Sequence, residues 1–268
     1  MGEHKHNLKN LVAPESVMIS YVTNGNVKEK TMVSLVRTLA FDRAKLKLVV
    51  DIGSQTGLYI ADNRDKTVEN FLIHPKKPKW FMSIDTDIVW DPEQLYVLLE
   101  AAAELECPVL GGMYFTFIAE GTVHPVWKQK VGDAFAPVMG TFGAGVSQVD
   151  VLGMGFTVIR RDVLEKMAVV YKYDRWRWFG HDEIYFEGRK QPMGEDVTFC
   201  ERVRAIGFNT YGHAGVRVGH LKEILLDDKF FALLSQMSRG MSGSIVGTGS
   251  QVVEDVDVRV NHAGDTIT

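Results

Sequence analysis

The stretch Lys79-Trp-Phe-Met-Ser-Ile-Asp-Thr-Asp-Ile-Val-Trp-Asp-Pro92 decides which fold class we expect. Its first half is a mostly apolar run of the length of a buried strand, and this run ends in Asp85-Thr-Asp87. Pro92 then stands at the favoured first position of a helix whose apolar side chains recur at helical spacing. A strand, an acidic edge and an amphipathic helix in this order are typical of an α/β protein.

The same alternation of strands and helices extends on both sides of this stretch. Helical spacing predicts helices, and apolar or β-branched runs predict strands. The predicted strands are 16–22, 46–52, 79–84, 107–117, 149–159, 208–211 and 214–218, and the predicted helices are 32–40, 68–72, 92–102, 163–167, 195–206 and 225–237. Residues 119–148 predict hairpins and loops. This order predicts a mixed, mostly parallel sheet flanked by helices, with a loop-rich region and a C-terminal helix and tail.

Composition excludes several classes of protein. The chain has 268 residues, 46% hydrophobic and 24% charged, which is enough apolar material for a globular core. A net charge of −4 disfavours a nucleic-acid-coating role. Cys107 and Cys200 are too few for a disulfide framework and favour a reduced, cytoplasmic setting. No run approaches the roughly 18 apolar residues of a membrane span, and the polar start has no signal-peptide core.

The pair Asp85 and Asp87 is the first candidate site. Residues i and i+2 of a strand point to the same side, so both carboxylates can converge on one cation. Oxygen ligands suit Mg²⁺ or Mn²⁺, and the carboxyl end of a strand is where α/β sheets bind ligands. The alternative is two solvated acids at a strand end, one of them capping a helix.

Glu195 and Asp196 open a predicted helix, and His220 follows a short predicted strand. Acids in a first helical turn are often dipole complements, but a carboxylate there can also take a proton from a substrate hydroxyl. An ordinary aspartate has a pKa of about 3.9 and would be ionised at neutral pH. His220 is either structural or a ligand, and His213 competes for the same role.

An aromatic group in the segment 171–191 has two interpretations. Its side chains could stack on a sugar while the segment closes as a mobile lid, or they could anchor a loop to the core. The group consists of Trp176, Trp178, Phe179 and Tyr185.

Three segments in order resemble the GT-A glycosyltransferases, especially the family 2-like branch and its compact phage-encoded members. Phe81-Met-Ser-Ile-Asp-Thr-Asp-Ile-Val-Trp-Asp-Pro92 resembles their metal-binding signature. Val149-Asp-Val-Leu-Gly-Met-Gly-Phe-Thr-Val-Ile-Arg-Arg-Asp162 is similar to their acceptor-side strand and helix, and Gly194-Glu-Asp-Val-Thr-Phe-Cys-Glu-Arg resembles their Glu-Asp helix. The resemblance covers residues 16–224.

This resemblance implies a GT-A, Rossmann-like fold. Residues 1–240 would form a single catalytic domain, with a nucleotide-binding half at about 16–118 and an acceptor half at about 119–224. Residues 241–268 would be a Gly/Ser-rich linker and tail.

The resemblance also implies roles for the acidic and histidine residues. Asp87 would bind Mn²⁺ or Mg²⁺ directly, Asp85 would face the ribose or a metal-bound water, and His220 would complete the coordination. Asp196 would be the catalytic base, with Glu195 beside it.

Residues outside these clusters match family positions that hold the nucleotide. Tyr21, Thr23 and Asp51 match positions around the base. Arg64 resembles an arginine near the nucleotide, although the order Ala61-Asp-Asn-Arg64 departs from the usual Ala-Arg-Asn. A surface salt bridge is the alternative for Arg64.

The implied activity is metal-dependent transfer of a sugar from a nucleotide-sugar, UDP favoured and GDP second, to a hydroxyl of a glycan, protein or lipid. An Asp196 base favours inversion. One alternative is a sugar-nucleotide nucleotidyltransferase, although Thr23-Asn-Gly-Asn-Val27 lacks the basic character of its phosphate loop. Another is a noncatalytic carbohydrate-binding or virion-associated protein of the same fold.

Overall fold

The computed structural model describes residues 8–117, 123–132, 134–138, 143–186, 189–223, 228 and 235. The chain divides into two units, Met1–Lys222 and Glu223–Thr268. Asp228 and Ser235 are helical, in agreement with the helix predicted at 225–237. The rest of that helix, the predicted domain boundary at 240 and the predicted linker and tail at 241–268 lie outside the described residues.

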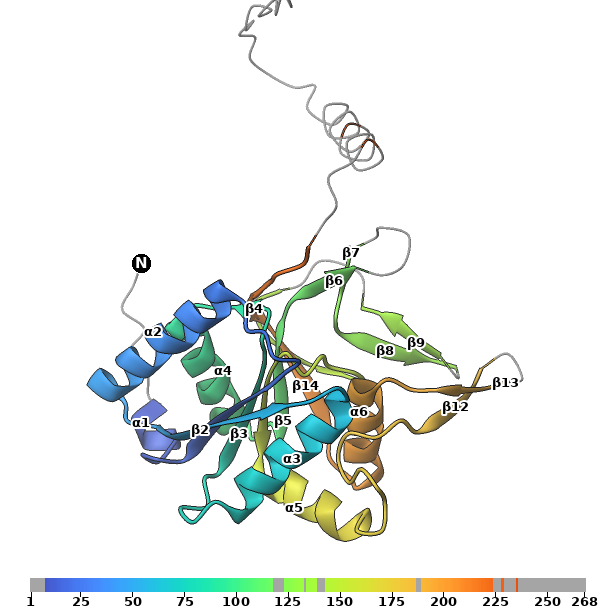
Figure 1. Ribbon diagram of the computed structural model, residues 1–268, viewed down its shortest axis with the longest axis horizontal. Coiled ribbons are helices and arrows are strands. Elements are labelled where there is room, and N and C mark those ends of the chain that lie inside the picture. Colours follow the sequence, from blue (N-terminus) through green and yellow to red (C-terminus); the bar gives the residue numbers. More distant parts are fainter. Residues whose placement is uncertain are drawn as a thin grey trace, which may run out of the picture. The chain divides into compact units, whose positions relative to one another are not determined.

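A seven-stranded sheet in the order β10-β14-β5-β11-β3-β1-β2 forms the centre of the first unit (Figure 1). Strands β1, β2, β3, β5 and β14 run in one direction, whereas β10 and β11 are antiparallel to them. The predicted mixed, mostly parallel sheet is therefore confirmed. The strands are β1 Val17–Thr23, β2 Val49–Thr56, β3 Trp80–Asp85, β5 Val109–Met113, β10 Val146–Val149, β11 Phe156–Arg160 and β14 Thr210–Arg217.

Helices cover both faces of this sheet (Figure 1). One face carries α1 Leu8–Leu11, α2 Glu29–Lys45 and α4 Pro92–Glu104, and the other carries α3 Ile60–Ile73, α5 Arg161–Val170 and α6 Glu195–Ala205. Every helix in the described ranges is too short or too polar to cross a lipid bilayer.

Two apolar clusters lie between the sheet and these two helical layers. The two-residue period of β3 sends Met82 into the first cluster and Phe81 into the second. Burial of such a side chain contributes about 1.5–3 kcal/mol, so a strand that is apolar on both sides must lie inside the sheet. This explains why the run before Asp85 occupies a central strand.

Short hairpins surround the sheet, as the composition of 119–148 predicts for the described part of that region. They pair β6 Phe115–Phe117 with β7 Val123–Pro125, β8 Lys128–Val131 with β9 Ala134–Pro137, and β12 Glu183–Phe186 with β13 Arg189–Pro192. A further short pair, which is not a hairpin, joins the distant strands β4 Ile88–Val89 and β15 Gly219–His220.

The bounds predicted for the second strand, 46–52, are wrong. Asp42, near the end of α2, accepts the backbone N–H groups of Leu48 and Val49 at 3.0 and 3.1 Å, which delays the start of β2 to Val49. The strand then continues through Gly53, which pairs with Ser20 of β1. Gly53 is therefore not a stop signal, and a Cβ there would lie 2.6 Å from the Met18 side chain.

Other predicted bounds differ from the structure as well: the strand predicted at 107–117 divides into β5 and β6, and the helix predicted at 68–72 is α3, which begins at Ile60. The strand predicted at 149–159 divides into β10 and β11, because residues 150–155 leave the central sheet around Gly153 and Gly155. The strands predicted at 208–211 and 214–218 form one strand, β14, which pairs with β5.

Candidate functional site

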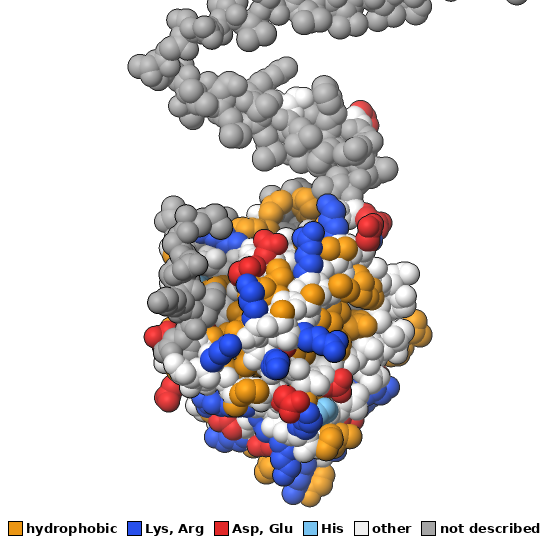
Figure 2. All heavy atoms as spheres, turned by 90° about the vertical axis from the view of Figure 1, so that its left-hand side faces the viewer, with side chains coloured by type: hydrophobic (Ala, Val, Ile, Leu, Met, Phe, Trp, Pro, Cys, Tyr) orange, Lys and Arg blue, Asp and Glu red, His pale blue; other side chains and the backbone are white. Residues whose placement is uncertain are grey.

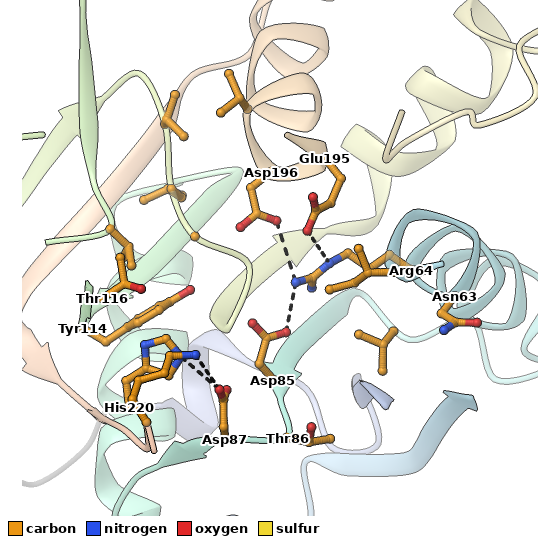
Figure 3. A pocket seen from close by; sticks show the side chains of 18 of the residues that line it. Asn63, Arg64, Asp85, Thr86, Asp87, Tyr114, Thr116, Glu195, Asp196 and His220 are labelled. Atoms are coloured by element: carbon orange, nitrogen blue, oxygen red, sulfur yellow. Dashed lines mark hydrogen bonds and ion pairs between the residues drawn. The ribbon is translucent and has the colours of Figure 1, made fainter. Parts of the chain in front are cut away.

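A cavity of about 520 Å³ lies beyond the carboxyl ends of β1, β3 and β5, at the edge of the sheet where α/β proteins bind ligands (Figure 3). The starts of α3 and α6 also reach it. Its lining includes Thr23, Asn63, Arg64, Asp85, Asp87, Tyr114, Lys128, Glu195, Asp196, His220 and Lys222.

Arg64 of α3 is the centre of one half of the cavity (Figure 3). Its Nη2 lies 3.0 Å from Asp85 Oδ1 and 3.7 Å from Asp196 Oδ1, and its Nε lies 3.9 Å from Glu195 Oε1. The Arg64 side chain is buried, so the alternative of a surface salt bridge is wrong. The guanidinium is always protonated and presents several N–H groups in one plane, which suits it to join carboxylates from β3 and α6.

Asp196 is not the ordinary aspartate that its position in the sequence predicts. Desolvation by burial raises its pKa to about 7; Arg64 opposes this rise, and the negative charges of Glu195 and Asp85 add to it. Asp196 Oδ2 accepts the backbone N–H of Met154 at 3.2 Å. Within the described residues, the buried Oδ1 accepts no hydrogen bond.

Asp87 forms the second half of the cavity, together with His220 and Lys222. Its Oδ2 lies 3.1 Å from His220 Nε2 and 2.8 Å from Lys222 Nζ. The pairing of β15 with β4 sets His220 opposite Ile88 and thereby beside Asp87. Burial works to raise the pKa of Asp87, but the hydrogen bonds and charges of His220 and Lys222 outweigh it and lower the pKa to about 2.

The side chains of Asp85, Asp87 and His220 match a Mn²⁺ or Mg²⁺ site in their chemistry. Two carboxylates and an imidazole form a suitable donor set, and all three line one cavity. His220 Nδ1 lies 2.7 Å from the carbonyl oxygen of Phe115. A hydrogen bond from Nδ1–H to this carbonyl directs Nε2 toward Asp87, an arrangement common for metal-binding histidines, and a bound ion would take the place of the proton that Nε2 shares with Asp87.

The arrangement differs from a finished metal site in one respect. In the described part of the chain, no three His, Cys, Asp or Glu side chains converge closely enough to bind an ion. Asp85 is paired with Arg64, and Lys222 contacts Asp87. Asp87 and His220 therefore fit a divalent ion on the condition that Lys222 leaves Asp87, while Asp85 stays paired with Arg64 beside them.

Tyr114 is a cavity residue that the sequence analysis missed. Its buried hydroxyl accepts the N–H of Gly155 at 3.0 Å, and its ring packs edge-on against His220, with the ring centroids 5.1 Å apart. A Cβ on Gly155 would lie 2.7 Å from this hydroxyl and 3.0 Å from Asp85 Oδ2. Gly155 thus leaves room for both groups, and the Gly-Met-Gly run was the signal that could have indicated a close neighbour.

Lys222 and Asn63 were missed as well. Lys222 stands two residues after His220, and this extended-chain spacing could have predicted a side chain on the same side. Asn63 precedes Arg64 and donates to the Gly57 carbonyl at 3.1 Å, which holds the loop between β2 and α3.

Of the residues predicted to hold the nucleotide base, only Thr23 lies in the cavity. Its hydroxyl donates to the Asn26 carbonyl at 2.9 Å and accepts the Gly25 N–H at 3.0 Å. Tyr21 packs against the apolar cluster on the side of α1, α2 and α4. Side chains alternate along β1, so the next residue, Val22, points to the opposite side and lines the cavity. Asp51 lies near the start of β2, exposed beside His74, because the strand extends beyond its predicted end.

The aromatic segment anchors a loop rather than forming a sugar platform. Trp178 and Phe179 are each 1% exposed and belong to the core. Asp65 of α3 accepts the backbone N–H groups of Arg177 and Phe179 at 2.6 and 2.8 Å. Trp176 donates to Asp62. These contacts support the loop-anchor interpretation for Trp176, Trp178 and Phe179. The Tyr185 side chain lies outside what the structure describes, and closure of the segment as a lid stays a prediction.

Comparison with solved structures shows the class of fold. The crystal structure of GalNAc-T7 with UDP, GalNAc and Mn²⁺ matches with a TM-score of 0.51 and 10% identity, over 79% of this chain and 45% of that one. A197 from STIV matches with a TM-score of 0.49 and 20% identity, over 77% and 86% of the two chains. The likeness to GalNAc-T7 confirms the expected GT-A-like fold.

At such low identity this likeness concerns the fold alone. No protein-family model matches the chain, and none of the curated proteins matches it. Membership of the family 2-like branch therefore stays a prediction.

Replacing Arg64 should destabilise the protein strongly. Arg64→Met leaves Asp85, Glu195 and Asp196 without their shared cation, and breaking a buried ion pair costs about 3–5 kcal/mol. Urea unfolding at neutral pH measures this loss. The matched control is Arg175→Met, since Arg175 is 71% exposed and pairs with Asp62 at 3.8 Å; its effect should stay below about 1 kcal/mol. Similar losses in the two variants would contradict the central role of Arg64.

Removing the Lys222 ammonium should strengthen Mn²⁺ binding. In Lys222→Met the carboxylate of Asp87 loses a competing cation, and the Mn²⁺ Kd should fall by about 2–5-fold, as expected for an exposed ion pair. Titration of the full-length chain, with free Mn²⁺ followed by electron paramagnetic resonance, gives the Kd directly. Lys222→Arg is the control and should bind Mn²⁺ like the wild type, while Asp87→Asn should bind far more weakly. An unchanged Kd in Lys222→Met would show that the ammonium and the metal do not compete.

Proposed function

We propose that this protein is a glycosyltransferase that moves a sugar from a nucleotide-activated donor to an acceptor hydroxyl. One observation carries the proposal: a single cavity at the carboxyl edge of the sheet gathers Asp85, Asp87, Asp196 and His220. The GT-A-like fold supports the same conclusion, because it is the fold of GalNAc-T7, whose structure was determined with UDP, GalNAc and Mn²⁺. We extend that donor class, with UDP favoured, to this chain.

The half of the cavity around Asp87 would receive the diphosphate of the donor. Asp87 and His220 would hold Mn²⁺ or Mg²⁺, with Asp85 close by, and the ion would supply positive charge to the leaving diphosphate. Lys222, once released from Asp87, would place a further positive charge at the same edge. Thr23, at the end of β1, lines the cavity on the side where the nucleoside would lie.

The half around Asp196 would receive the acceptor. Its carboxylate would take the proton of the acceptor hydroxyl while the hydroxyl oxygen forms a bond to the anomeric carbon and the bond from that carbon to the diphosphate oxygen breaks. A single displacement of this kind inverts the anomeric configuration. Arg64 would fix the orientation of Asp196 through the ion pair, and Glu195 would remain beside it.

A donor screen with the full-length chain tests this function. We expect release of UDP from UDP-sugars with Mn²⁺, and less release from GDP- or dTDP-sugars. Asp87→Asn should lose the metal-dependent turnover, and Asp196→Asn should lose about 10²–10⁴-fold in turnover while still binding the donor. The control is Asp162→Asn, because Asp162 pairs with Arg160 outside the cavity.

Two outcomes would reject the proposal, one from this screen and one from a companion assay that supplies nucleoside triphosphates and sugar phosphates. Nucleoside diphosphate release that is absent with every donor would contradict a glycosyltransferase. Formation of pyrophosphate from a nucleoside triphosphate and a sugar phosphate would identify a nucleotidyltransferase instead.

The pH profile should report the raised pKa of Asp196. A base must be deprotonated to act, so kcat/KM should rise with pH up to a plateau above the pKa of about 7, rather than above the usual value near 4. Arg64, Glu195 and Asp85 are the charged groups that face Asp196 and set this pKa. The residual activity of Asp196→Asn should lack this rise. A wild-type profile that is flat from about pH 5 to 8 would exclude Asp196 as the base.

A further inference from the structure

Helix α2 exposes several apolar side chains although it also packs Leu35, Leu39 and Phe41 against the core. The residues that it buries are mostly polar: Thr31, Ser34, Leu35, Thr38 and Asp42. In contrast, Met32, Val33 and Val36 are 38%, 42% and 58% exposed. Ala40 and Ala44 continue the same outward stripe and are exposed as well. A helix that serves the fold alone has its apolar stripe facing the core.

The buried polar side chains account for how α2 is attached. Thr38 Oγ1 accepts the indole N–H of Trp90 at 2.9 Å, and Ser34 Oγ accepts the Trp90 backbone N–H at 3.1 Å. Asp42 holds the start of β2. The fold therefore has a use for the inner face of α2, while Met32, Val33 and Val36 on its outer side remain partly exposed to solvent.

Basic side chains lie among these exposed apolar ones. Lys30, Arg37 and Arg43 of α2 are exposed, and no ion pair with another described residue neutralises them. Lys45, the last residue of α2, and Lys47, just after it, extend the charge, while the exposed acid on α2 is Glu29. Figure 2 views the side of the molecule on which α2 lies in Figure 1, and it shows lysine and arginine side chains around exposed hydrophobic ones, with some acidic side chains among them. This local charge contrasts with the net charge of −4 for the chain.

We propose that this outward surface, the α2 face, docks on an anionic membrane. The α2 face consists of Lys30, Met32, Val33, Val36, Arg37, Ala40, Arg43 and Ala44. Its apolar side chains would enter the headgroup region of the lipids, while its cations would contact the lipid phosphates. An anionic bilayer supplies a negative and an apolar surface together, which matches both properties of this face.

A second copy of the chain matches the α2 face less well. Two-fold association would bring together two identical surfaces that each carry Lys30, Arg37 and Arg43 against a single exposed acid of α2, Glu29, so net repulsion would oppose it. The membrane interpretation also gives the face a position relative to the cavity: the Lys28 N–H, just before α2, donates at 3.0 Å to the carbonyl of Thr86, between Asp85 and Asp87. Docking would therefore hold the cavity near the lipid surface. This inference does not depend on the proposed catalytic activity.

Vesicle sedimentation with the full-length chain tests the proposal. Binding to vesicles of phosphatidylcholine with phosphatidylglycerol should exceed binding to pure phosphatidylcholine by about tenfold or more at about 0.1 M salt. It should weaken sharply at about 0.5 M salt, where screening shortens the reach of the charges.

Paired variants separate the α2 face from general surface effects. Val33→Ser with Val36→Ser, and separately Arg37→Gln with Arg43→Gln, should each lower binding to the anionic vesicles by about fivefold or more. The apolar control is Val169→Ser with Val170→Ser on α5, where the two valines are 70% and 54% exposed. The charge control is Lys66→Gln with Lys172→Gln, both exposed positions elsewhere. Both control pairs should bind like the wild type.

Three outcomes would overturn the proposal. The first is absence of binding to the anionic vesicles. The second is equal binding by the α2 variants and their controls. The third is a dimer, detected by light scattering, that disappears in the Val33 and Val36 variant, because it would assign this face to a second copy.

Discussion

The arrangement of the cavity depends on one buried cation. The Arg64 guanidinium stands among Asp85, Glu195 and Asp196, which come from β3 and from the start of α6. Without it, three acids would meet in a region of low dielectric, and their mutual repulsion would push the strand end and the helix start apart. Arg64 thus allows the end of β3 and the start of α6 to lie close together at the cavity.

The same balance of charges gives the acids of the cavity different properties. Desolvation and neighbouring acids raise the pKa of Asp196, whereas the contacts with His220 and Lys222 lower that of Asp87. One carboxyl is thereby suited to exchange a proton near neutral pH, and the other remains an anion suited to a cation. Environments that drive the pKa values of acids apart are a common property of catalytic sites. This division supports the proposed assignment of Asp196 to the acceptor and of Asp87 to the donor.

The α2 face illustrates a different constraint. The polar inner side of α2 is accounted for by hydrogen bonds to Trp90 and to the start of β2, so packing leaves the outward valines and arginines without a structural role. An apolar surface that a fold does not need is a sign of interaction with something else. The backbone contact of Lys28 with Thr86 links this surface to the edge that carries the cavity.

The elements that could be predicted are those encoded by neighbouring residues. Local signals include the apolar run of β3 with its acidic end, the start of α4 at Pro92 and the acids at the start of α6. The mixed sheet and the candidates Asp85, Asp87, Asp196 and His220 were predicted from signals of this kind.

Other features of the site join residues far apart in the chain. They are the burial of Arg64, the contact of Lys222 with Asp87 and the position of Tyr114. Asp51 and Tyr21, which were predicted to hold the nucleotide base, lie outside the cavity for a related reason. Asp42 of α2 determines where β2 starts, and the packing of the sheet determines which side of β1 faces the cavity. Local sequence specifies residue types and their spacing, whereas the partners, burial and charge balance of a site exist only once distant segments pack together.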